Sequence, residues 1–249
     1  MEISVLVTVK NDIENMKLLV SSLKTLGKDF EIVVVDAYST DGTYEFIKSE
    51  ADGERFIVSQ IEGKRAVGRN ECIRLSHGDK LVFLDSDSEI TPGWETALKG
   101  QISREILAGK IVQELGSRWS DLERVPMYYK GKDVTFPSNN LMYSRNVIDK
   151  IGRFDERFHT AEDIDLNIRA VEMGYEIFYD EGVVIFHHPR KSYVSMLKQS
   201  YSNGIGRRLI MEKWGIKSSF NRANLRRHPF IESTRLISGM LGYTIGGRN

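Results

Sequence analysis

Two carboxylates follow one apolar segment of the sequence and could bind a divalent cation. Lys80 to Asp85 reads Lys-Leu-Val-Phe-Leu-Asp, and Asp85-Ser86-Asp87 places two carboxylates two residues apart at the end of this expected strand. Residues two apart in a strand point to the same side, so both carboxylates can leave the sheet together. Mg²⁺ and Mn²⁺ bind a few carboxylate oxygens and keep positions open for phosphate oxygens and water. The alternative is a solvated acidic turn before the helix expected after Pro92.

A second acidic group, Glu162-Asp163-Ile164-Asp165, lies at the start of the helix expected over Ala161 to Met173. The helix dipole favours negative charge at that end, so capping explains the group without any chemistry. Asp163 could instead act as a general base that takes a proton from an attacking hydroxyl group. His187 or its neighbour His188 ends a later apolar run and could add a nitrogen ligand to the metal.

Strands and helices alternate over the first hundred residues and would position these groups. The expected strands are Ile3 to Val9, Glu31 to Asp36, Phe56 to Ser59 and Lys80 to Asp85, with a helix over Lys64 to Ser76. This alternation predicts an α/β domain with a mostly parallel, doubly wound sheet. Ligands of such sheets bind beyond the carboxyl ends of the strands, where Thr8, Asp36 and Asp85 lie. Taken singly, each of these residues could equally be a helix cap.

The second half of the chain is less regular. It predicts a strand over Ala108 to Leu115, a long loop over Arg118 to Asp133, an extended segment over Thr135 to Tyr143, a short helix over Asn146 to Ile151 and a strand over Tyr175 to His187. From Tyr193 onwards the pattern is helical, with interruptions expected at Gly204-Ile205-Gly206, Trp214-Gly215 and His228-Pro229. We therefore expect a C-terminal helical tail.

Composition narrows the classes of function. The 249 residues carry 35 acidic and 35 basic side chains, so no overall field indicates a nucleic-acid partner. The single cysteine, Cys72, excludes an intramolecular disulfide framework and favours the cytoplasm. We find no signal peptide and no run of eighteen apolar residues, so we expect no transmembrane helix. Arginines interleave with apolar residues after Lys198, which fits either a solvated basic face or peripheral contact with an anionic membrane.

The order of the motifs resembles that of the family-two glycosyltransferases, which have the GT-A fold and mostly invert configuration at the transferred sugar. The first half carries S-V-L-V-T-V-K-N at 4–11, V-V-V-D at 33–36 with S-T-D-G-T at 39–43, G-K-R-A-V-G-R-N at 63–70 and L-V-F-L-D-S-D at 81–87. The second half carries I-G-R-F-D-E-R-F at 151–158, A-E-D-I-D-L-N-I-R at 161–169 and F-H-H-P-R-K-S at 186–192. The resemblance implies a Rossmann-like nucleotide-binding half at 1–90, an acceptor-binding half at 91–192 and a helical extension at 193–249.

The resemblance also assigns roles to residues. It implies a nucleotide-sugar donor bound by Thr8, Val9, Asn11, Asp36, Lys64, Arg69, Asn70, Asp85, Ser86, Asp87, Asn140 and Arg207. Asp36 would read the base or ribose, Asn140 with Ser138 and Asn139 would meet the donor sugar, and Arg207 or Arg208 would approach the leaving diphosphate. Asp163 matches the catalytic base. The implied Mn²⁺ or Mg²⁺ would bind Asp87 and His187 and, in addition, Asp85; His187 is preferred to His188 because it is in register with Val183 and Ile185.

The family's processive synthases carry Q-x-x-R-W after the histidine, whereas Gln199 is followed here by Ser-Tyr-Ser-Asn. We therefore expect the transfer of a single sugar, from a UDP-sugar or alternatively from GDP-mannose, to a saccharide or lipid-linked acceptor. Two alternatives remain: an inactive module that binds sugar nucleotides or glycans, and a sugar-nucleotide pyrophosphorylase. The second needs a glycine-rich loop after the first strand, and residues 8–11 contain no glycine. A dinucleotide-dependent dehydrogenase is disfavoured because G-x-G-x-x-G is missing.

Overall fold

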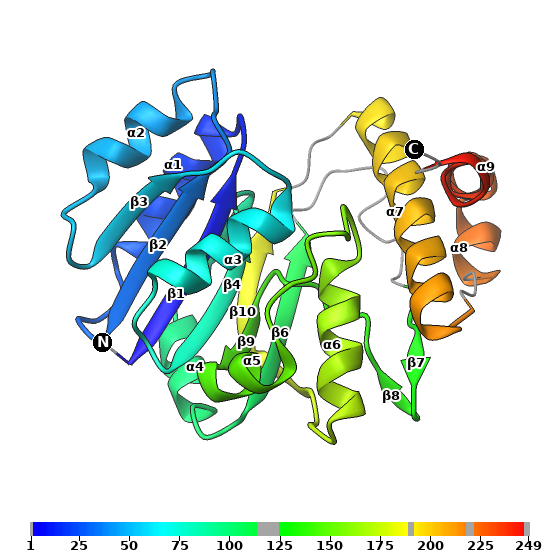
Figure 1. Cartoon of the computed structure of the whole chain (residues 1–249). Helices are drawn as coiled ribbons and strands as arrows, with labels where there is room; N and C mark the ends of the chain where they lie inside the picture. The colour runs from blue at the N-terminus through cyan, green and yellow to red at the C-terminus, as the bar shows by residue number, and fades with distance from the viewer. Residues whose placement is uncertain (1, 114–124, 189–191, 218–221, 247–249) are drawn as a thin grey trace.

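A central sheet with helices on both faces is followed by a group of C-terminal helices (Figure 1). This computed structural model describes residues 2–113, 125–188, 192–217 and 222–246. The strands are β1 (Ile3–Val9), β2 (Phe30–Asp36), β3 (Phe56–Gln60), β4 (Lys80–Asp85), β5 (Ser88–Ile90), β6 (Ile106–Gln113), β7 (Tyr128–Tyr129), β8 (Lys132–Asp133), β9 (Leu141–Ser144) and β10 (Phe178–His187). The helices are α1 (Ile13–Leu23), α2 (Thr43–Glu50), α3 (Arg65–Leu75), α4 (Trp94–Gly100), α5 (Arg145–Ile151), α6 (Glu162–Glu172), α7 (Tyr193–Trp214), α8 (Arg222–Arg227) and α9 (Pro229–Ile245).

The first half of the sheet has the predicted parallel order. β3, β2, β1 and β4 are neighbours in that sequence and run parallel. The register places Thr8 opposite both Val35 and Asp85, and Val9 opposite Asp36. The polar residues at the strand ends therefore lie at one edge of the sheet, as expected for parallel strands that end together.

The second half of the sheet mixes directions. β9 is antiparallel to both β4 and β6, while β6 and β10 are parallel. The short strand β5 completes the sheet by pairing antiparallel with β10, with Ser88 opposite His187. This pairing positions the site, because it brings the turn that contains Asp85-Ser86-Asp87 beside the end of β10.

Apolar residues fill both faces of the sheet, which explains the nearly continuous hydrophobic strands. One core cluster joins Val5, Val7 and Val34 to Leu19 and Val20 of α1. The other cluster lies beneath α3, α5 and α6 and is formed by Leu6, Val33, Phe83, Ala66, Ile73, Val147 and Leu166, among others. The expected α/β architecture with a mostly parallel sheet and a helical tail is confirmed.

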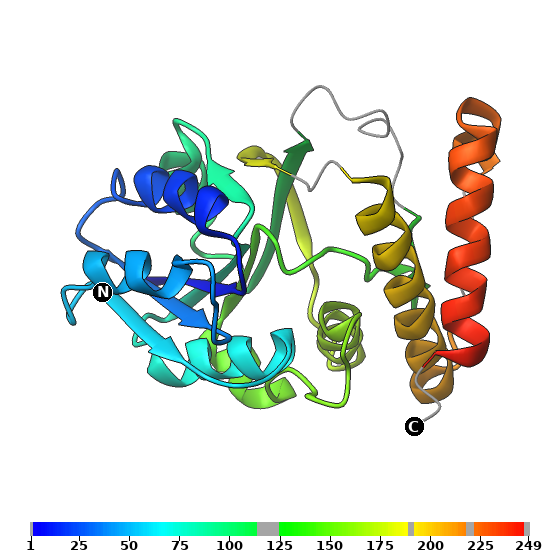
Figure 2. The ribbon, with the colours of Figure 1, turned by 90° about the horizontal axis from the view of Figure 1, so that it is seen from above.

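The tail departs from the prediction in one respect. α7 continues through Gly204-Ile205-Gly206, where we expected an interruption, and ends at Trp214 before Gly215. The glycines are used for close packing instead: α9 lies alongside α7, on the side away from the sheet (Figure 2). A Cβ on Gly204 would lie 1.9 Å from the Gly239 carbonyl oxygen, and a Cβ on Gly242 would lie 1.9 Å from that of Tyr201.

We expect Gly204→Ala and Gly242→Ala each to lower the free energy of unfolding by about 1–3 kcal/mol, because the added methyl group overpacks the contact between the helices. Gly239→Ala is the matched control, since its Cβ would meet its nearest atom, the Ser200 carbonyl oxygen, at 3.4 Å. That variant should be neutral or slightly stabilising because alanine favours helix. The three variants are compared by the midpoints of their unfolding in urea. Equal midpoints for all of them would contradict the packing described here.

Three smaller expectations need correction. Part of the loop expected over residues 118–133 is a short hairpin, β7 with β8, while residues 118–124 lie outside the described residues. The extended segment expected from Thr135 is strand only over β9. β10 begins at Phe178 instead of Tyr175, and its pairing with β6 shifts register between Asp180 and Val184.

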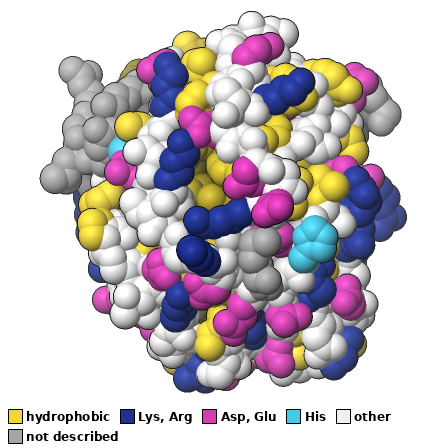
Figure 3. Space-filling model, turned by 90° about the vertical axis from the view of Figure 1, so that its left-hand side faces the viewer, with side chains coloured by type: hydrophobic (Ala, Val, Ile, Leu, Met, Phe, Trp, Pro, Cys, Tyr) yellow, Lys and Arg dark blue, Asp and Glu magenta, His cyan; other side chains and the backbone are white. Residues whose placement is uncertain are grey.

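The surface and the helices fit the balanced composition. Lys and Arg side chains are interspersed with Asp and Glu on the face shown in Figure 3. Within the described ranges, none of the helices has both the length and the apolar character needed to cross a bilayer.

Candidate functional site

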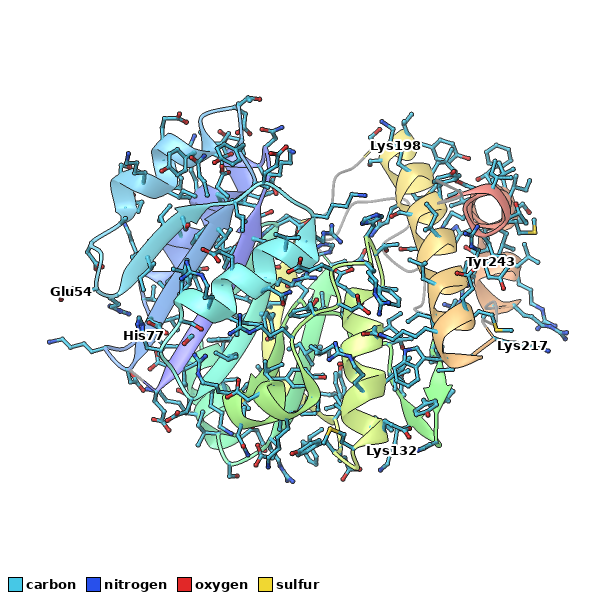
Figure 4. All side chains as sticks on the ribbon, viewed as in Figure 1. Glu54, His77, Lys132, Lys198, Lys217 and Tyr243 are labelled. Atoms are coloured by element: carbon cyan, nitrogen blue, oxygen red, sulfur yellow. The ribbon has the colours of Figure 1, made fainter. Side chains whose placement is uncertain are left out.

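A cleft of about 810 Å³ lies between the carboxyl ends of the strands and helix α7. The strand side contributes Thr8 and Val9 of β1, the Asp85-Ser86-Asp87 turn, and His187 at the end of β10. The opposite wall includes Ser195, Lys198, Gln199 and Asn203 of α7 and Arg235 of α9. Figure 4 labels Lys198 near the N-terminal end of α7. The tail is therefore one wall of the cleft.

The first turn of α3 forms the rim of the cleft near β1. A Cβ on Gly68 would lie 2.9 Å from the Thr8 Cγ2 atom, so α3 packs directly against the end of β1. Lys64, which precedes α3, and Arg65 in its first turn both line the cleft and are exposed. Two positive charges at a helix N-terminus suit an anionic ligand.

Asp36 has an unused acceptor at the end of β2. Its side chain is fully buried, and its Oδ2 atom accepts hydrogen bonds from the Ser39 backbone N–H and the Gln60 amide, both at 2.9 Å. Its Oδ1 atom has no partner among the described residues, although neighbouring Val35 and Ala37 line the cleft. A buried carboxylate oxygen without a donor is costly, which suits a site that a ligand N–H or O–H completes.

Asp85 is bound by a buried arginine. Arg69, 3% exposed, donates to Asp85 Oδ1 at 2.8 Å and to Glu162, which is also buried. Burial would lower the pKa of Arg69, but the charges of Asp85, Glu162 and Asp163 outweigh it and raise the pKa. Arg69 does not line the cleft. It joins the end of β4 to the start of α6 and so fixes the distance between the two acidic motifs.

We expect Arg69→Met to lower the free energy of unfolding by about 3–5 kcal/mol, because the methionine leaves buried Glu162 without a counterion. Arg74→Met is the matched control: Arg74 also binds a carboxylate, that of Glu71, but its side chain is 58% exposed. Its loss should leave the free energy of unfolding nearly unchanged, because exposed ion pairs contribute little to stability. Chemical denaturation measures both. Similar losses in the two variants would show that Arg69 does not hold the motifs together.

Asp87 and His187 form a pair on the floor of the cleft. Asp87 Oδ2 lies 3.3 Å from His187 Nε2, and both residues line the cleft. Burial would raise the pKa of Asp87, but His187 and Arg65 outweigh it and lower that pKa. Burial likewise opposes the charged form of His187, yet Asp87 and Asp85 raise the pKa of the imidazole. Each partner therefore stabilises the charged form of the other.

The donor set fits a divalent cation. Asp87 Oδ1 and His187 Nδ1 are buried and have no partner in the part of the chain that the structure describes. A carboxylate with an imidazole suits Mn²⁺ or Mg²⁺ when phosphate oxygens and water complete the coordination. No group of three or more His, Cys, Asp or Glu residues capable of holding a metal is assembled among the described side chains. Asp85 is held by Arg69 instead of joining the pair.

The neighbouring histidine has a different partner. His188 Nε2 lies 3.0 Å from Glu89 Oε2, and the His188 backbone N–H donates to the Asp87 carbonyl at 2.8 Å. His188 and Glu89 do not line the cleft, whereas His187 does. Of the two adjacent histidines, His187 is the one placed to bind a ligand.

Asp163 lies at the start of α6, half-buried. Its oxygens accept hydrogen bonds from the Ser138 and Ile164 backbone N–H groups, at 3.2 and 2.8 Å. The pKa of Asp163 is raised to about 6, because burial and the charge of Glu162 outweigh the opposing effects of Arg69 and of the two backbone N–H groups. The residue is not in the cleft lining, although His159 and Thr160, just before α6, are. A carboxylate with such a pKa can accept a proton near neutral pH.

The structure places several predicted donor-binding residues outside the cleft lining. Asn70 binds the backbone of Phe154 through both ends of its amide, at 2.9 and 3.0 Å. Buried Asn140 accepts from the Trp94 indole at 2.9 Å and donates to two backbone carbonyls. The Asn11 side chain accepts from the Thr40 backbone N–H. Each of these amides holds the fold together in the absence of a ligand.

The arginines of α7 also lie outside the lining. Arg207 is half-buried, and burial together with the charge of Arg235 lowers its pKa. Arg208 donates to the Gly246 carbonyl at 2.8 Å and pairs with Glu212 at 2.9 Å. Arg235 of α9 lines the cleft, whereas Arg207 and Arg208 do not.

Sequence reasoning missed several lining residues. Arg65 was in the quoted motif but received no role. Asp12 received no role either, but it lines the cleft, and its Oδ2 atom accepts a hydrogen bond from Ser86 Oγ at 2.8 Å. For Lys198 and Arg235, the sequence indicated only that they belong to a basic tail. Their contribution depends on how α7 and α9 pack, which no local pattern reveals.

Comparison with known proteins gives a family and several relatives. The family model described as "Glycosyl transferase family 2" matches residues 4–152. "Glycosyltransferase AglE" of Haloferax volcanii is 24% identical over 241 residues, covering 90% of this chain and 77% of that protein. The "Pre-mycofactocin glycosyltransferase" of Mycobacterium tuberculosis is 26% identical over 212 residues, covering 76% and 43%. The chain therefore spans less than half the length of the second relative.

Solved structures share the fold. Mannosyltransferase PcManGT from Pyrobaculum calidifontis, in complex with GDP-Man and Mn2+, matches with a TM-score of 0.66 and 15% identity, covering 97% of this chain and 72% of that one. S. aureus TarS, in complex with UDP-GlcNAc, matches with a TM-score of 0.62 and 19% identity, covering 98% and 80%.

Proposed function

Because the chain belongs to glycosyl transferase family 2, we propose that it transfers a single sugar, with inversion, from a nucleotide sugar to an acceptor hydroxyl. The family membership confirms the resemblance seen in the motifs, and the structural relatives confirm the GT-A type of α/β fold. The chain is thus a glycosyltransferase. Its donor, its metal, its acceptor and the roles of its residues are our proposals.

The observation that carries the proposal is the pairing of Asp87 with His187 at the carboxyl edge of the sheet, each with an unused buried atom. We assign the donor's base and ribose to the wall near Thr8, Val9 and Asp36, and its diphosphate to the rim near Lys64 and Arg65. A Mn²⁺ or Mg²⁺ ion on Asp87 and His187 would supply Lewis acidity for charge that develops on the departing diphosphate. Mn²⁺ in the Pyrobaculum mannosyltransferase supports this assignment.

Asp163 is our proposed catalytic base. Its carboxylate takes the proton of the acceptor hydroxyl as the oxygen attacks the anomeric carbon. Ser138 and Ile164 hold the carboxylate through their backbone N–H groups, and the charge of Arg69 lowers its pKa. Arg69 and Glu162 are positioning residues in this scheme, because they act through Asp85 and Asp163.

The pH profile of kcat/KM should have an acid limb near pH 6. The base form of Asp163 is required, and because its pKa is raised to about 6, that form is lost as the pH falls through this value. Activity should then fall about tenfold for each pH unit below the limb and stay level above it. Initial rates in overlapping buffers test this. A profile that stays level down to pH 4.5, about the ordinary range of a carboxylate, would contradict the assignment.

We favour a UDP-sugar as the donor, with GDP-mannose as the alternative, since the structural relatives include complexes with UDP-GlcNAc and with GDP-Man. For the acceptor we propose a saccharide or a lipid-linked acceptor at the cytosolic side of a membrane. The name of one relative from Methanococcus voltae supports the lipid-linked choice: "Dolichyl N-acetyl-alpha-D-glucosaminyl phosphate 3-beta-D-2,3-diacetamido-2,3-dideoxy-beta-D-glucuronosyltransferase". That relative is 22% identical and is covered over 65% of its length. We favour a transferase over the pyrophosphorylase because the matched family is one of glycosyl transferases.

The stereochemistry of donor hydrolysis tests the proposal before the acceptor is identified. Water can replace the acceptor, so an α-linked UDP-sugar incubated with the protein and Mn²⁺ should first release the β-anomer, which ¹H NMR detects before mutarotation. Asp163→Asn is the control and should release neither anomer above background. First release of the α-anomer would exclude inversion. Absence of turnover with both UDP-sugars and GDP-mannose, at protein concentrations that bind them, would favour an inactive binding module.

A further inference from the structure

Helix α9 has an apolar outer face. Phe230, Ile237, Met240, Leu241 and Ile245 are 73%, 54%, 59%, 48% and 57% exposed. Residues 230, 237, 241 and 245 are seven and four positions apart, so they lie on one side of the helix. Monomeric proteins in water rarely leave an apolar stripe of this size uncovered.

Small and polar groups of α9 hold the helix against α7. The Thr234 Oγ1 atom accepts from the Tyr193 hydroxyl at 2.6 Å, and the Ser238 hydroxyl donates to the Leu197 carbonyl at 2.8 Å. Gly242 packs directly on the Tyr201 backbone. Because these contacts fix α9 on α7, the apolar stripe cannot turn inward. Figure 2 shows α9 on the outer side of α7, away from the sheet.

Exposed arginines of α8 come directly before α9 in the chain. Arg222, Arg226 and Arg227 of α8 are exposed just before α9 begins. Residues 222–246 contain a single acidic residue, Glu232, and it is buried and bound by Arg235 at 2.7 Å. No exposed carboxylate therefore offsets the arginines within these residues.

From the apolar stripe and the arginines we propose that α8 and α9 dock on an anionic lipid surface. Phe230, Ile237, Met240, Leu241 and Ile245 would enter the interface of the bilayer, and the arginines of α8 would meet the lipid headgroups. α9 has 17 residues and lies on the membrane instead of crossing it. A second copy of the chain fits less well, because pairing two such surfaces brings the arginines of α8 together while residues 222–246 supply no exposed carboxylate. This inference does not depend on the proposed function.

Binding to vesicles tests the proposal. We compare vesicles of phosphatidylcholine alone with vesicles in which about a third of the lipid is phosphatidylglycerol. The protein should sediment with the anionic vesicles and be released by high salt. The triple variant Ile237→Gln, Met240→Gln, Leu241→Gln should bind at least about tenfold more weakly, and glutamine preserves helix propensity. Its control is Leu18→Gln with Met173→Gln, two exposed apolar residues outside the tail that should leave vesicle binding unchanged.

The variant Arg226→Gln, Arg227→Gln separates the contribution of charge. It should lose most of the extra binding to anionic vesicles while binding to phosphatidylcholine alone stays the same. If the wild-type protein remains in the supernatant with both kinds of vesicle, the proposal is wrong. Sedimentation velocity adds a second arm: a concentration-dependent dimer that the triple variant abolishes, without vesicle binding, would assign the stripe to self-association. Calorimetric nucleotide binding by the triple variant should equal that of the wild type, so failure here is distinguishable from failure of the donor site.

Discussion

Replacing Asp163 with asparagine is expected to reduce the rate of sugar transfer by about 10²- to 10⁴-fold, the usual contribution of a general base. Asparagine has nearly the same shape and can still accept a hydrogen bond from the Ser138 or Ile164 backbone N–H, but it cannot take the acceptor's proton. Donor binding should change little, because Asp163 lies outside the lining of the cleft. Initial rates at saturating donor, together with calorimetric donor affinity, separate the two effects.

The stability of Asp163→Asn provides the control. In the folded chain the pKa of Asp163 is raised to about 6, above the ordinary range of a carboxylate, so the folded state binds the proton more tightly than the unfolded chain. Its contribution to stability is complete below the unfolded pKa and is lost as the pH rises through the folded value. At pH 8 the wild type has lost that contribution, and the neutral variant should be at least as stable in urea. A variant that keeps most of its transfer rate would remove Asp163 from the mechanism.

Asp87→Asn and His187→Ala should each reduce metal-dependent transfer by at least about 10³-fold, because Lewis-acid stabilisation of the leaving group amounts to several kcal/mol. The adjacent pair offers matched controls. Glu89→Gln and His188→Ala alter a second carboxylate and imidazole that also bind each other, at 3.0 Å, but outside the cleft lining. These controls should keep the Mn²⁺ dependence of the wild type.

Titration of Mn²⁺ into assays of all four variants makes this comparison. We expect the apparent affinity for Mn²⁺ to fall in the two cleft variants alone. If His188→Ala lost metal dependence and His187→Ala did not, our choice between the adjacent histidines would be wrong. If both histidine variants kept their metal dependence, the protein ligands of the metal would be carboxylates alone.

Local sequence patterns predicted the first half of the fold well. β1, β2 and β4 are continuous apolar runs whose ends carry Thr8, Asp36 and Asp85, and parallel pairing brings those ends to one edge. The helix expected over Lys64 to Ser76 was equally predictable and corresponds to α3. The structure of the tail was harder to predict. Glycine has a low helix propensity, which indicated a break at Gly204, but Gly204 fits within α7 because Gly239 packs against it.

The arrangement of the candidate site could be predicted only in part. The motifs contained Asp85, Asp87, Asp163 and His187, but their pairing depends on tertiary contacts. Ser88, in a strand of only three residues, is what places Asp87 beside His187. Arg69 is buried between two acidic motifs that are 77 residues apart, Asp85 and Glu162, and no local rule assigns it there. Lys198 and Arg235 enter the cleft only because the tail folds back over the sheet edge.

The central claim is that the cleft binds a nucleotide sugar through a cation on Asp87 and His187. Calorimetric titration of UDP, UDP-sugars and GDP-mannose into the wild type and Asp87→Ala, with and without Mn²⁺, tests it most directly. We predict that one nucleotide binds with a strong dependence on Mn²⁺ and that Asp87→Ala removes this dependence. Binding that is equal with and without Mn²⁺, or no binding of any of these nucleotides, would contradict the account.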